Sequence, residues 1–308
     1  MVRGCSMIIV FAVLMLGCGQ NDKREIIIFH AGSLSVPMAE LEAAFEDKHP
    51  HIDIVREATG SVDCARKITE LNKSCDIMAS ADVSVIDTFL IPEYATWNLP
   101  FAGNEMVIAF TEKSRYKESI SNSNWHQILA KKDVYYGRSD PDADPCGYRS
   151  VLSMKLQEKR LAANGLTQQL MTKDQEYIRP KETDLLGLLE SHAIDYIFIY
   201  RSVAEQHKLP YLRLSDSVNL SKPALNNWYS NAEVAIAGNK PGQTVQMQGQ
   251  AMVYSTTLLN MAPNPEDALS FLQFMLNKEG RKIIKQNGQN AVYPKNTNQI
   301  PEKLLPLL

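Results

Sequence analysis

Three short apolar runs in the first eighty residues most constrain the fold, because the first two each lead through small residues into a helix. Residues 26–29, 52–56 and 76–79 have the length of buried strands. Apolar residues at helical spacing follow the first two runs, over 36–45 and 62–71. A repeated order of strand, loop and helix is typical of a parallel sheet with helices on its faces. The sequence therefore predicts an α/β protein.

A second α/β lobe is predicted in the middle of the chain. A strand at 106–110 follows Asn104-Glu105, a helix is expected over about 150–163, and a further strand at 196–200. The chain has 308 residues, which is enough for two compact lobes. No internal repeat or low-complexity tract suggests a different architecture.

The last third of the chain is expected to return to the first lobe. An alternating strand in GQAMVYSTTLL precedes a long amphipathic helix with a break at Lys278-Glu279-Gly280. Two lobes joined by two crossings leave a cleft between them, which is the usual place for a ligand. We expect lobe 1 to comprise 25–103 and 256–308, and lobe 2 to comprise 104–255.

The N-terminus has the order of a secretory signal. Arg3 precedes an apolar run over 7–16, which is too short to span a bilayer. Gly17 and Cys18 follow, and this pair resembles a bacterial lipoprotein cleavage box, although Met15 stands where leucine is usual. The alternatives are a plain cleaved signal and an uncleaved anchor.

We expect Cys18 to be acylated. Residues 1–17 would then be a lipoprotein signal peptide and residues 18–24 a polar tether. The protein would be extracytoplasmic and anchored to a membrane, in the periplasm or at the cell surface. A net charge of −3, with no basic stripe, argues against binding to nucleic acid.

Five cysteines remain to be assigned. Cys5 and Cys18 belong to the leader, which leaves Cys64, Cys75 and Cys146 in the exported protein. An odd number leaves at least one thiol unpaired, and the spacing does not fit a zinc site. Cys64 and Cys75 are close enough in sequence to bridge, but sequence alone does not decide whether they do.

Two loops in the first lobe share one plan, in which a strand, a small-residue turn with a serine and a helix follow one another. Ser33 lies in FHAGSLS and Ser61 in ATGSVD. Free amides and the positive end of the helix dipole make such a loop suitable for an anion. Simple capping of each helix is the alternative. Two such loops at strand ends of one open sheet would face the same cleft.

Three alternating carboxylates in GRSDPDADPCGYRS raise the possibility of a calcium site. A calcium loop that starts at Asp140 requires glycine at its sixth position and glutamate at its twelfth. Those positions hold Pro145 and Val151, so the pattern fails. Asp140 and Asp142 are then expected to be solvated turn residues.

Asp144 and Glu182 differ from the other acidic residues because each stands where a helix is expected to begin. Asp144 directly precedes Pro145-Cys146-Gly147, and Glu182 follows the extended segment 179–181. A residue before proline is extended, and aspartate is a common cap. For Glu182 the simplest alternative is a first-turn carboxylate that interacts with the helix dipole.

Several segments together resemble a known family. They are FHAGSLSVPM, TGSVDCARKITEL, DIMASAD, IPEYATW, DPCGYRS, RPKETDLLGLLE and IDYIFIYRSVAEQH. They are similar to the tungstate/molybdate-binding proteins of ABC transporters, in the tungstate-type branch, and the likeness runs from about residue 25 to 288. The resemblance implies a class II periplasmic binding protein fold, in which two α/β lobes close over a tetrahedral oxyanion.

The resemblance also implies a set of oxyanion-binding residues. Hydroxyls and amides of the first lobe correspond to Ser33 and Ser61. The second lobe is expected to contribute amides at Cys146 and Gly147, and a tyrosine that corresponds to Tyr200.

The tungstate-type branch further implies two carboxylates that approach the metal itself and make it six-coordinate. We assign these to Asp144 and Glu182, because both begin helices of the second lobe. Asp140 is an alternative to the former, and Glu190 or Glu205 to the latter.

The chemistry of this site is coherent on its own terms. Tungsten(VI) and molybdenum(VI) are electron-poor and accept oxygen donors beyond their four oxo groups, whereas sulfur in sulfate does not. Carboxylates would therefore attract tungstate and repel sulfate. Helix ends and hydroxyls would supply the donors, with no need for lysine or arginine.

The expected function is that of a substrate-binding lipoprotein that captures tungstate or molybdate and delivers it to the permease of an ABC importer. It would act as a monomer without a cofactor and would not be an enzyme. The alternatives are a sulfate or phosphate binder, a calcium-binding protein, and an enzyme in which Cys146 acts with His192 or His207.

Overall fold

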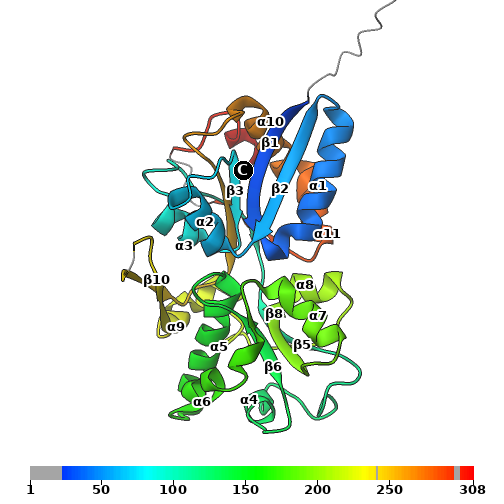
Figure 1. Ribbon diagram of the computed structural model, residues 1–308, viewed down its shortest axis with the longest axis vertical. Helices are drawn as coiled ribbons and strands as arrows, with labels where there is room; N and C mark the ends of the chain where they lie inside the picture. The colour runs from blue at the N-terminus through cyan, green and yellow to red at the C-terminus, as the bar shows by residue number, and fades with distance from the viewer. Residues whose placement is uncertain (1–22, 241, 295–298) are drawn as a thin grey trace, which may run out of the picture.

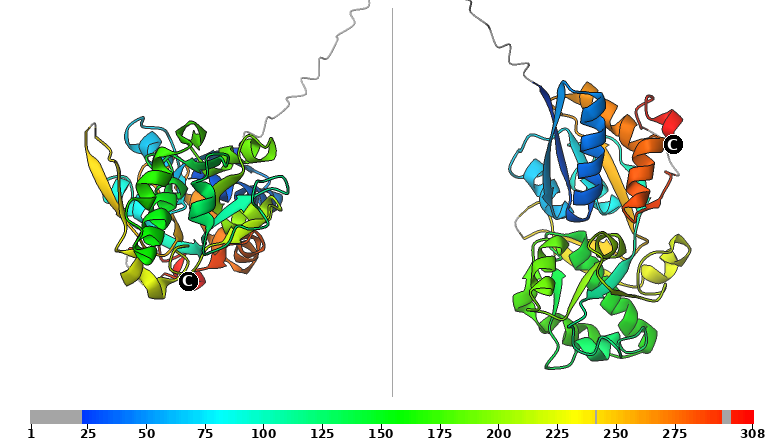
Figure 2. Two further views of the ribbon diagram at one scale, coloured as in Figure 1. Left: turned by 90° about the horizontal axis from the view of Figure 1, so that it is seen from below. Right: turned by 90° about the vertical axis from the view of Figure 1, so that its right-hand side faces the viewer.

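The computed structural model describes residues 23–240, 242–294 and 299–308, which form two stacked lobes (Figures 1 and 2). The predicted signal peptide and Cys18 lie outside the described residues. Within the described ranges, no helix has the length and apolar character needed to cross a membrane. We call the lobe that contains the first strand the first lobe, and the other the second lobe.

A six-stranded sheet forms the centre of the first lobe. Strands β1 (Arg24–Ala31), β2 (Ile52–Thr59) and β3 (Ile77–Ser80) are parallel, with β1 in the middle. The remaining strands run antiparallel to their neighbours and complete the order β13-β4-β12-β3-β1-β2; they are β4 (Leu99–Gly103), β12 (Val253–Leu258) and β13 (Asn290–Ala291). The sheet thus joins the start of the chain to its last third.

Helices cover both faces of this sheet, as Figure 1 shows. On one face α1 (Ser35–Lys48) packs with α10 (Pro265–Leu276) and α11 (Lys278–Gln286), and on the other lie α2 (Ser61–Thr69) and α3 (Val83–Phe89). The predicted break in the last long helix falls one residue earlier than expected. Asn277 ends α10, and its side chain accepts hydrogen bonds from the first amides of α11.

A five-stranded mixed sheet forms the centre of the second lobe, in the order β7-β6-β8-β5-β9. Its strands are β5 (Met106–Phe110), β6 (Tyr136–Ser139), β7 (Ile178–Arg179), β8 (Tyr196–Tyr200) and β9 (Tyr211–Arg213). Figure 1 shows α5 and α6 on one side of this sheet and α7 and α8 on the other. These helices are α5 (Pro145–Leu161), α6 (Leu166–Thr172), α7 (Leu185–Glu190) and α8 (Arg201–Gln206).

Two short helices and a two-stranded ribbon complete the second lobe. The short helices α4 (Trp125–Leu129) and α9 (Asn226–Tyr229) lie at its periphery. Strands β10 (Glu233–Ala237) and β11 (Thr244–Gln248) form a separate antiparallel ribbon. Buried and exposed residues alternate along β10, as expected for a ribbon that covers the lobe with one face.

Two predicted elements differ from the structure in instructive ways. Helix α5 begins at Pro145 rather than near Ser150, because Asp144 caps it and Pro145 occupies its first turn. Strand β12 is buried almost throughout instead of alternating, since it lies inside the sheet between β3 and β4.

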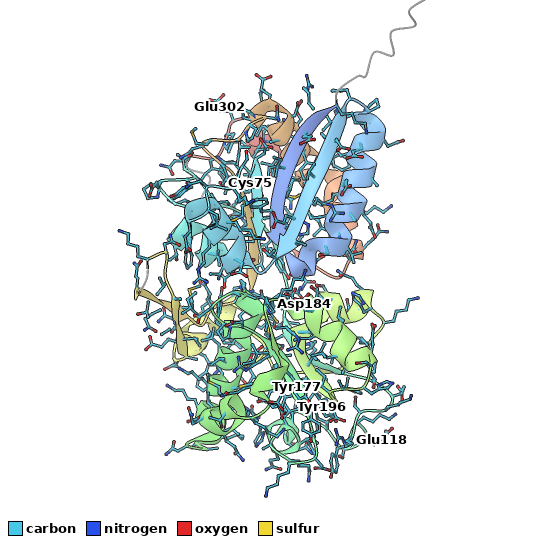
Figure 3. All side chains as sticks on the ribbon, in the orientation of Figure 1. Cys75, Glu118, Tyr177, Asp184, Tyr196 and Glu302 are labelled. Atoms are coloured by element: carbon cyan, nitrogen blue, oxygen red, sulfur yellow. The ribbon has the colours of Figure 1, made fainter. Side chains whose placement is uncertain are left out.

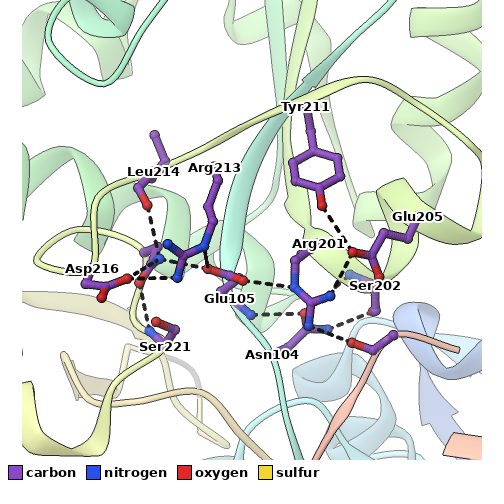
Figure 4. A network of polar contacts seen from close by, with 12 residues as sticks. Asn104, Glu105, Arg201, Ser202, Glu205, Tyr211, Arg213, Leu214, Asp216 and Ser221 are labelled. Atoms are coloured by element: carbon purple, nitrogen blue, oxygen red, sulfur yellow. Dashed lines mark hydrogen bonds and ion pairs between the residues drawn. The ribbon is translucent and has the colours of Figure 1, made fainter. Parts of the chain in front are cut away.

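The first crossing between the lobes is the short segment Asn104-Glu105, between β4 and β5. Figure 4 shows the Glu105 carboxylate between Arg201 and Arg213, at 2.9 and 2.8 Å. Arg201 also donates a hydrogen bond to the carbonyl of Gly288, at 2.8 Å. Because Gly288 lies in the first lobe, this arginine ties the crossing to both lobes.

The three described cysteines are buried, free thiols. Cys64 lies 3.0 Å from the hydroxyl of Thr59, and Cys75 donates to the carbonyl of Ile77. The bridge between Cys64 and Cys75 that the sequence left open is therefore not formed. Burial raises the pKa of the Cys64 thiol to about 11, so it stays protonated at neutral pH.

Candidate functional site

The loops that follow the strands of the two lobes meet at the lobe boundary. Ala143, which precedes α5, accepts a hydrogen bond at 3.2 Å from the amide of Asp63 at the start of α2. Lys181, which follows β7, donates to the carbonyl of Ala58 on β2 at 3.2 Å. Asp184 is labelled at this boundary in Figure 3. Carboxyl ends of strands from both sheets thus face one another, where ligands of open α/β sheets bind.

Two acidic side chains are buried together at this boundary. Asp144 and Glu182 are each 1% exposed. One carboxylate oxygen of Asp144 accepts a hydrogen bond from the amide of Cys146 at 3.3 Å, and the other accepts one from the amide of Glu182 at 3.1 Å. Asp144 therefore joins the start of α5 to the short helix η3 (Glu182–Asp184).

The Glu182 carboxyl differs from that of Asp144 because no N–H or O–H donor among the described residues reaches its two buried oxygens. It lies against the Asp144 carboxyl, with which it can form a hydrogen bond only when one of the two groups is protonated. A Cβ placed on Gly32 would lie 3.2 Å from one oxygen of Glu182, so the carboxylate faces the β1–α1 loop of the first lobe. A buried carboxylate that accepts no hydrogen bond is costly unless a further group interacts with it.

Burial raises the pKa of both carboxyl groups. The pKa of Asp144 lies above its ordinary value, and the pKa of Glu182 lies well above it because the charge of Asp144 adds to the effect of burial. Two ionised carboxylates in this place therefore require an electron-poor partner.

Ser33 and Ser61 are buried on the first-lobe side of the site. The hydroxyl of Tyr254 donates to Ser33 Oγ at 3.0 Å, and the amide of Ala81 donates to Ser61 Oγ at 3.0 Å. Within the part of the chain that the structure describes, neither serine hydroxyl donates a hydrogen bond in return. Each therefore has a proton available for an acceptor oxygen.

Tyr200 has the same arrangement on the second-lobe side. It is fully buried, and its hydroxyl accepts a hydrogen bond from Arg149 at 3.2 Å. Its ring lies 6.1 Å from that of Tyr254, which contacts Ser33. No acceptor for the Tyr200 hydroxyl proton is found among the described residues. Three available hydroxyl protons, from Ser33, Ser61 and Tyr200, thus lie in one buried region.

The amides of Cys146 and Gly147 are directed at Asp144 in this structure. The amide of Cys146 donates to the Asp144 side chain, and that of Gly147 to the Asp144 carbonyl at 2.9 Å. A Cβ on Gly147 would lie 2.5 Å from the carbonyl of Asp140, so glycine is required for the helix start to pack on this turn. The predicted contact of these amides with an anion stays a prediction.

The other two aspartates of the segment that fails the calcium-loop pattern form different contacts. Asp140 is half-buried and accepts from the amide of Asp142, whose own carboxylate accepts from the amide of Ala237 at 2.7 Å. Asp142 is exposed but not merely solvated, because it holds the β10–β11 ribbon. Across the described ranges, no group of three or more His, Cys, Asp or Glu side chains is arranged to hold a bare metal ion.

The alternative glutamates lie on the surface. Glu190 and Glu205 are exposed, and Glu205 forms an ion pair with Arg201 at 2.8 Å. Of the three glutamates considered from the sequence, Glu182 is therefore the one that the structure places beside Asp144.

The residues of the enzyme alternative are not brought together. The Cys146 thiol is fully buried and directed at the carbonyl of Phe198, at 3.7 Å. Burial raises its pKa well above the ordinary value, which is unfavourable for a nucleophile. His192 and His207 are both exposed.

Sequence reasoning missed several residues of the site, above all Arg149. This arginine is 1% exposed, forms an ion pair with Asp82 at 2.7 Å and donates to the Ala81 carbonyl at 2.8 Å. The site thus contains an arginine, although hydroxyls and helix ends were expected to suffice. A weak signal was present, because Arg149 stands four residues after Pro145 and so lies on the same face of α5.

Comparisons with known proteins place the chain in a family. A family model described as bacterial extracellular solute-binding protein matches residues 26–290. An uncharacterized solute-binding protein of Petrotoga mobilis is 45% identical, over 97% of this chain and 94% of that protein. The molybdate/tungstate-binding protein WtpA of Pyrococcus abyssi is 41% identical, over 94% of this chain and 92% of that protein. The resemblance noted in the sequence is confirmed.

Solved structures show the same fold. The periplasmic molybdate-binding protein of Azotobacter vinelandii superposes with a TM-score of 0.62 at 17% identity, covering 88% of this chain and all of that one. At this identity the likeness concerns the fold alone. The predicted two-lobed α/β class is thereby confirmed.

Proposed function

The chain belongs to the bacterial extracellular solute-binding protein family, and from this premise we propose that it captures tungstate or molybdate outside the cytoplasm for an ABC importer. Relatives named as molybdate/tungstate-binding proteins align over nearly the whole chain, which supports this choice of solute. The importer's permease, acylation of Cys18 and action as a monomer belong to the same proposal.

The observation that carries the proposal is the pairing of opposite chemistries in one buried region. Hydroxyl protons of Ser33, Ser61 and Tyr200 suit the oxygens of a tetrahedral oxyanion. The ionised carboxylate of Glu182, which lies next to Asp144 and accepts no hydrogen bond from a donor among the described residues, suits an electron-poor centre that accepts further oxygens. Tungstate and molybdate combine both properties in one ion.

The same arrangement disfavours sulfate and phosphate. Their central atoms do not take additional oxygen ligands, so their negative oxygens would meet the two carboxylates without compensation. Like charges at short range in a dry cleft repel strongly. Selectivity thus comes from repulsion of the wrong anion as well as attraction of the right one.

Titration calorimetry of the purified protein tests this function. Tungstate and molybdate are expected to bind, and sulfate at least about 100-fold more weakly, because only the first two compensate the carboxylates. The variant Glu190→Gln is a suitable control, since this exposed glutamate lies outside the proposed site. Sulfate binding of equal strength would contradict the proposal.

Tungstate affinity is expected to fall as the pH is lowered. Contact with the metal requires ionised Asp144 and Glu182, and burial raises the pKa of both, so protonation competes above the ordinary value of about 4. Because the pKa of each carboxyl group is raised when the lobes are closed, protonation of Asp144 and Glu182 stabilises the closed form without ligand. This contribution is fully present below the ordinary carboxyl pKa and is lost as the pH rises through the raised pKa. Acid therefore favours the protonated pair, and neutral pH favours the bound anion.

Calorimetry at a series of pH values from neutral to about 4, the ordinary carboxyl range, measures this dependence. The variant Glu182→Gln should retain a shallower dependence, because it has lost one of the two titrating groups. An affinity that stays constant over the series would argue against direct contact between carboxylate and metal.

A further inference from the structure

A buried ion pair crosses the boundary between the lobes. Arg149, on α5 of the second lobe, lies 2.7 Å from the Asp82 carboxylate of the first lobe and donates to the Ala81 carbonyl at 2.8 Å. The side chains of Arg149 and Asp82 are only 2% and 5% exposed. Burial lowers the pKa of the Arg149 guanidinium, but Asp82, Tyr200 and Tyr148 together raise it above its ordinary value.

Asp82 is held firmly by its own lobe. One carboxylate oxygen caps α3 by accepting from the amide of Ser84 at 2.9 Å, and its amide donates to the Ser80 hydroxyl at 3.0 Å. The other carboxylate oxygen accepts from the Tyr148 hydroxyl at 2.7 Å, in addition to its contact with Arg149. Two consecutive residues of the second lobe therefore converge on one fixed oxygen of the first.

The ion pair is in direct contact with the proposed anion site. Arg149 donates to the hydroxyl of Tyr200, and Ala81, whose carbonyl it also contacts, donates through its amide to Ser61. A hydroxyl from each lobe is thus oriented by groups that meet when the lobes are together. Other contacts across the boundary, such as that of Lys181 with Ala58, involve a more exposed side chain and a backbone carbonyl.

We propose that Arg149 is a positioning residue that couples closure of the lobes to retention of the anion, by pairing with Asp82 across the boundary while it orients Tyr200. The proposal rests on the proposed function for the identity of the anion. When the lobes separate, Arg149 and Asp82 regain water. Loss of one partner therefore leaves the other buried and unpaired in the closed form and penalises that form alone. Removal of either residue is therefore expected to raise the dissociation rate of the anion and to leave the association rate nearly unchanged, since association begins from separated lobes.

A double-mutant cycle measured by stopped-flow tungstate binding tests this coupling. The variants are Arg149→Met, Asp82→Asn and the double variant; asparagine still caps α3 because its oxygen accepts from the Ser84 amide. Each single change is expected to raise the dissociation rate by about 100-fold, with a change in the association rate of less than about 3-fold. The double variant should dissociate no faster than the single ones, because the unpaired charge is gone.

The matched control is Arg115→Met. Arg115 pairs with Asp195 at 2.7 Å inside the second lobe, so its loss is expected to affect thermal stability but neither rate. If the increases in dissociation rate caused by the two single changes multiply in the double variant, the two residues act independently and the proposed coupling is overturned. Tighter binding by Asp82→Asn together with loss of binding by Arg149→Met would also overturn it, because Arg149 would then contact the anion directly.

A second readout separates this proposal from the proposed function. Spin labels at Ala43→Cys and Glu190→Cys, both exposed and on different lobes, report the distance between the lobes. The native cysteines that the structure describes, Cys64, Cys75 and Cys146, are buried and should not react. In Arg149→Met and in Asp82→Asn, the labelled protein is expected to lose the population of short distances between the lobes that the labelled parent protein has. If the parent protein binds neither tungstate nor molybdate, the proposed function fails, and unchanged distance distributions in the variants would reject the ion pair's role separately.

Discussion

Replacing Gly60 by alanine is expected to weaken tungstate binding by at least about 100-fold while leaving the first lobe folded. A Cβ at this position would lie 2.2 Å from the carbonyl oxygen of Ala143 and 3.0 Å from the Cβ of Asp144. Both of these atoms belong to the second lobe, and the first is backbone, which cannot move aside as a side chain can. The clash therefore arises only when the lobes come together.

The backbone of Gly60 itself does not require glycine. Its φ and ψ are −61° and 144°, which any residue adopts, and alanine at a helix cap costs at most about 1 kcal/mol. Calorimetry should thus show the loss of binding, and thermal unfolding should show a small change in stability. Tungstate binding at the original strength would mean that the lobes do not approach as the structure shows.

Gly187→Ala is the matched control for this change. Gly187 lies in α7 and has no atom within 4 Å of a Cβ built on it. Alanine there is expected to stabilise the helix by up to about 1 kcal/mol and to leave binding unchanged.

Glu182→Gln is expected to separate stability from function. The change removes a buried acidic group that lies against the Asp144 carboxyl and that no donor among the described residues stabilises, so the free energy of unfolding at neutral pH should increase. Tungstate affinity should fall by about 100-fold or more, because an amide oxygen is a much poorer ligand for the metal than a carboxylate. The ratio of tungstate to sulfate affinity should narrow as well.

Thermal unfolding and calorimetry on the same preparation measure both effects. Glu190→Gln, at the exposed end of α7, should change neither quantity. A Glu182→Gln protein with undiminished tungstate affinity would show that another group contacts the metal.

Local patterns predict much of the fold because local packing decides it. The sequence predicts β5 and β8 with the bounds that the structure has, since each is a short apolar run between polar residues. Helix α5 starts at Pro145, about five residues before the helix expected over 150–163, and Asp144 caps it at the position where the sequence also indicates a helix start.

Some residues of the site can likewise be predicted from local sequence, and others cannot. Ser33, Ser61, Asp144 and Glu182 follow strand ends, so motif and topology together place them at the lobe boundary. Tyr254 contacts Ser33 from 221 positions away, and Arg149 contacts Asp82 from the opposite lobe. The first contact depends on the return of β12 to the first-lobe sheet and the second on how the lobes meet, and no local spacing encodes either. A buried arginine is also contrary to the usual exposure of this residue type.

The state of the thiols has a consequence for where such a protein can work. Cys64, Cys75 and Cys146 are buried and unbridged, and burial raises the pKa of each thiol. The described fold therefore gains no stability from an oxidising environment and loses none in a reducing one. The folding of the described residues is in this respect expected to be the same in oxic and anoxic surroundings, because none of these three thiols is part of a bridge that a reductant could break.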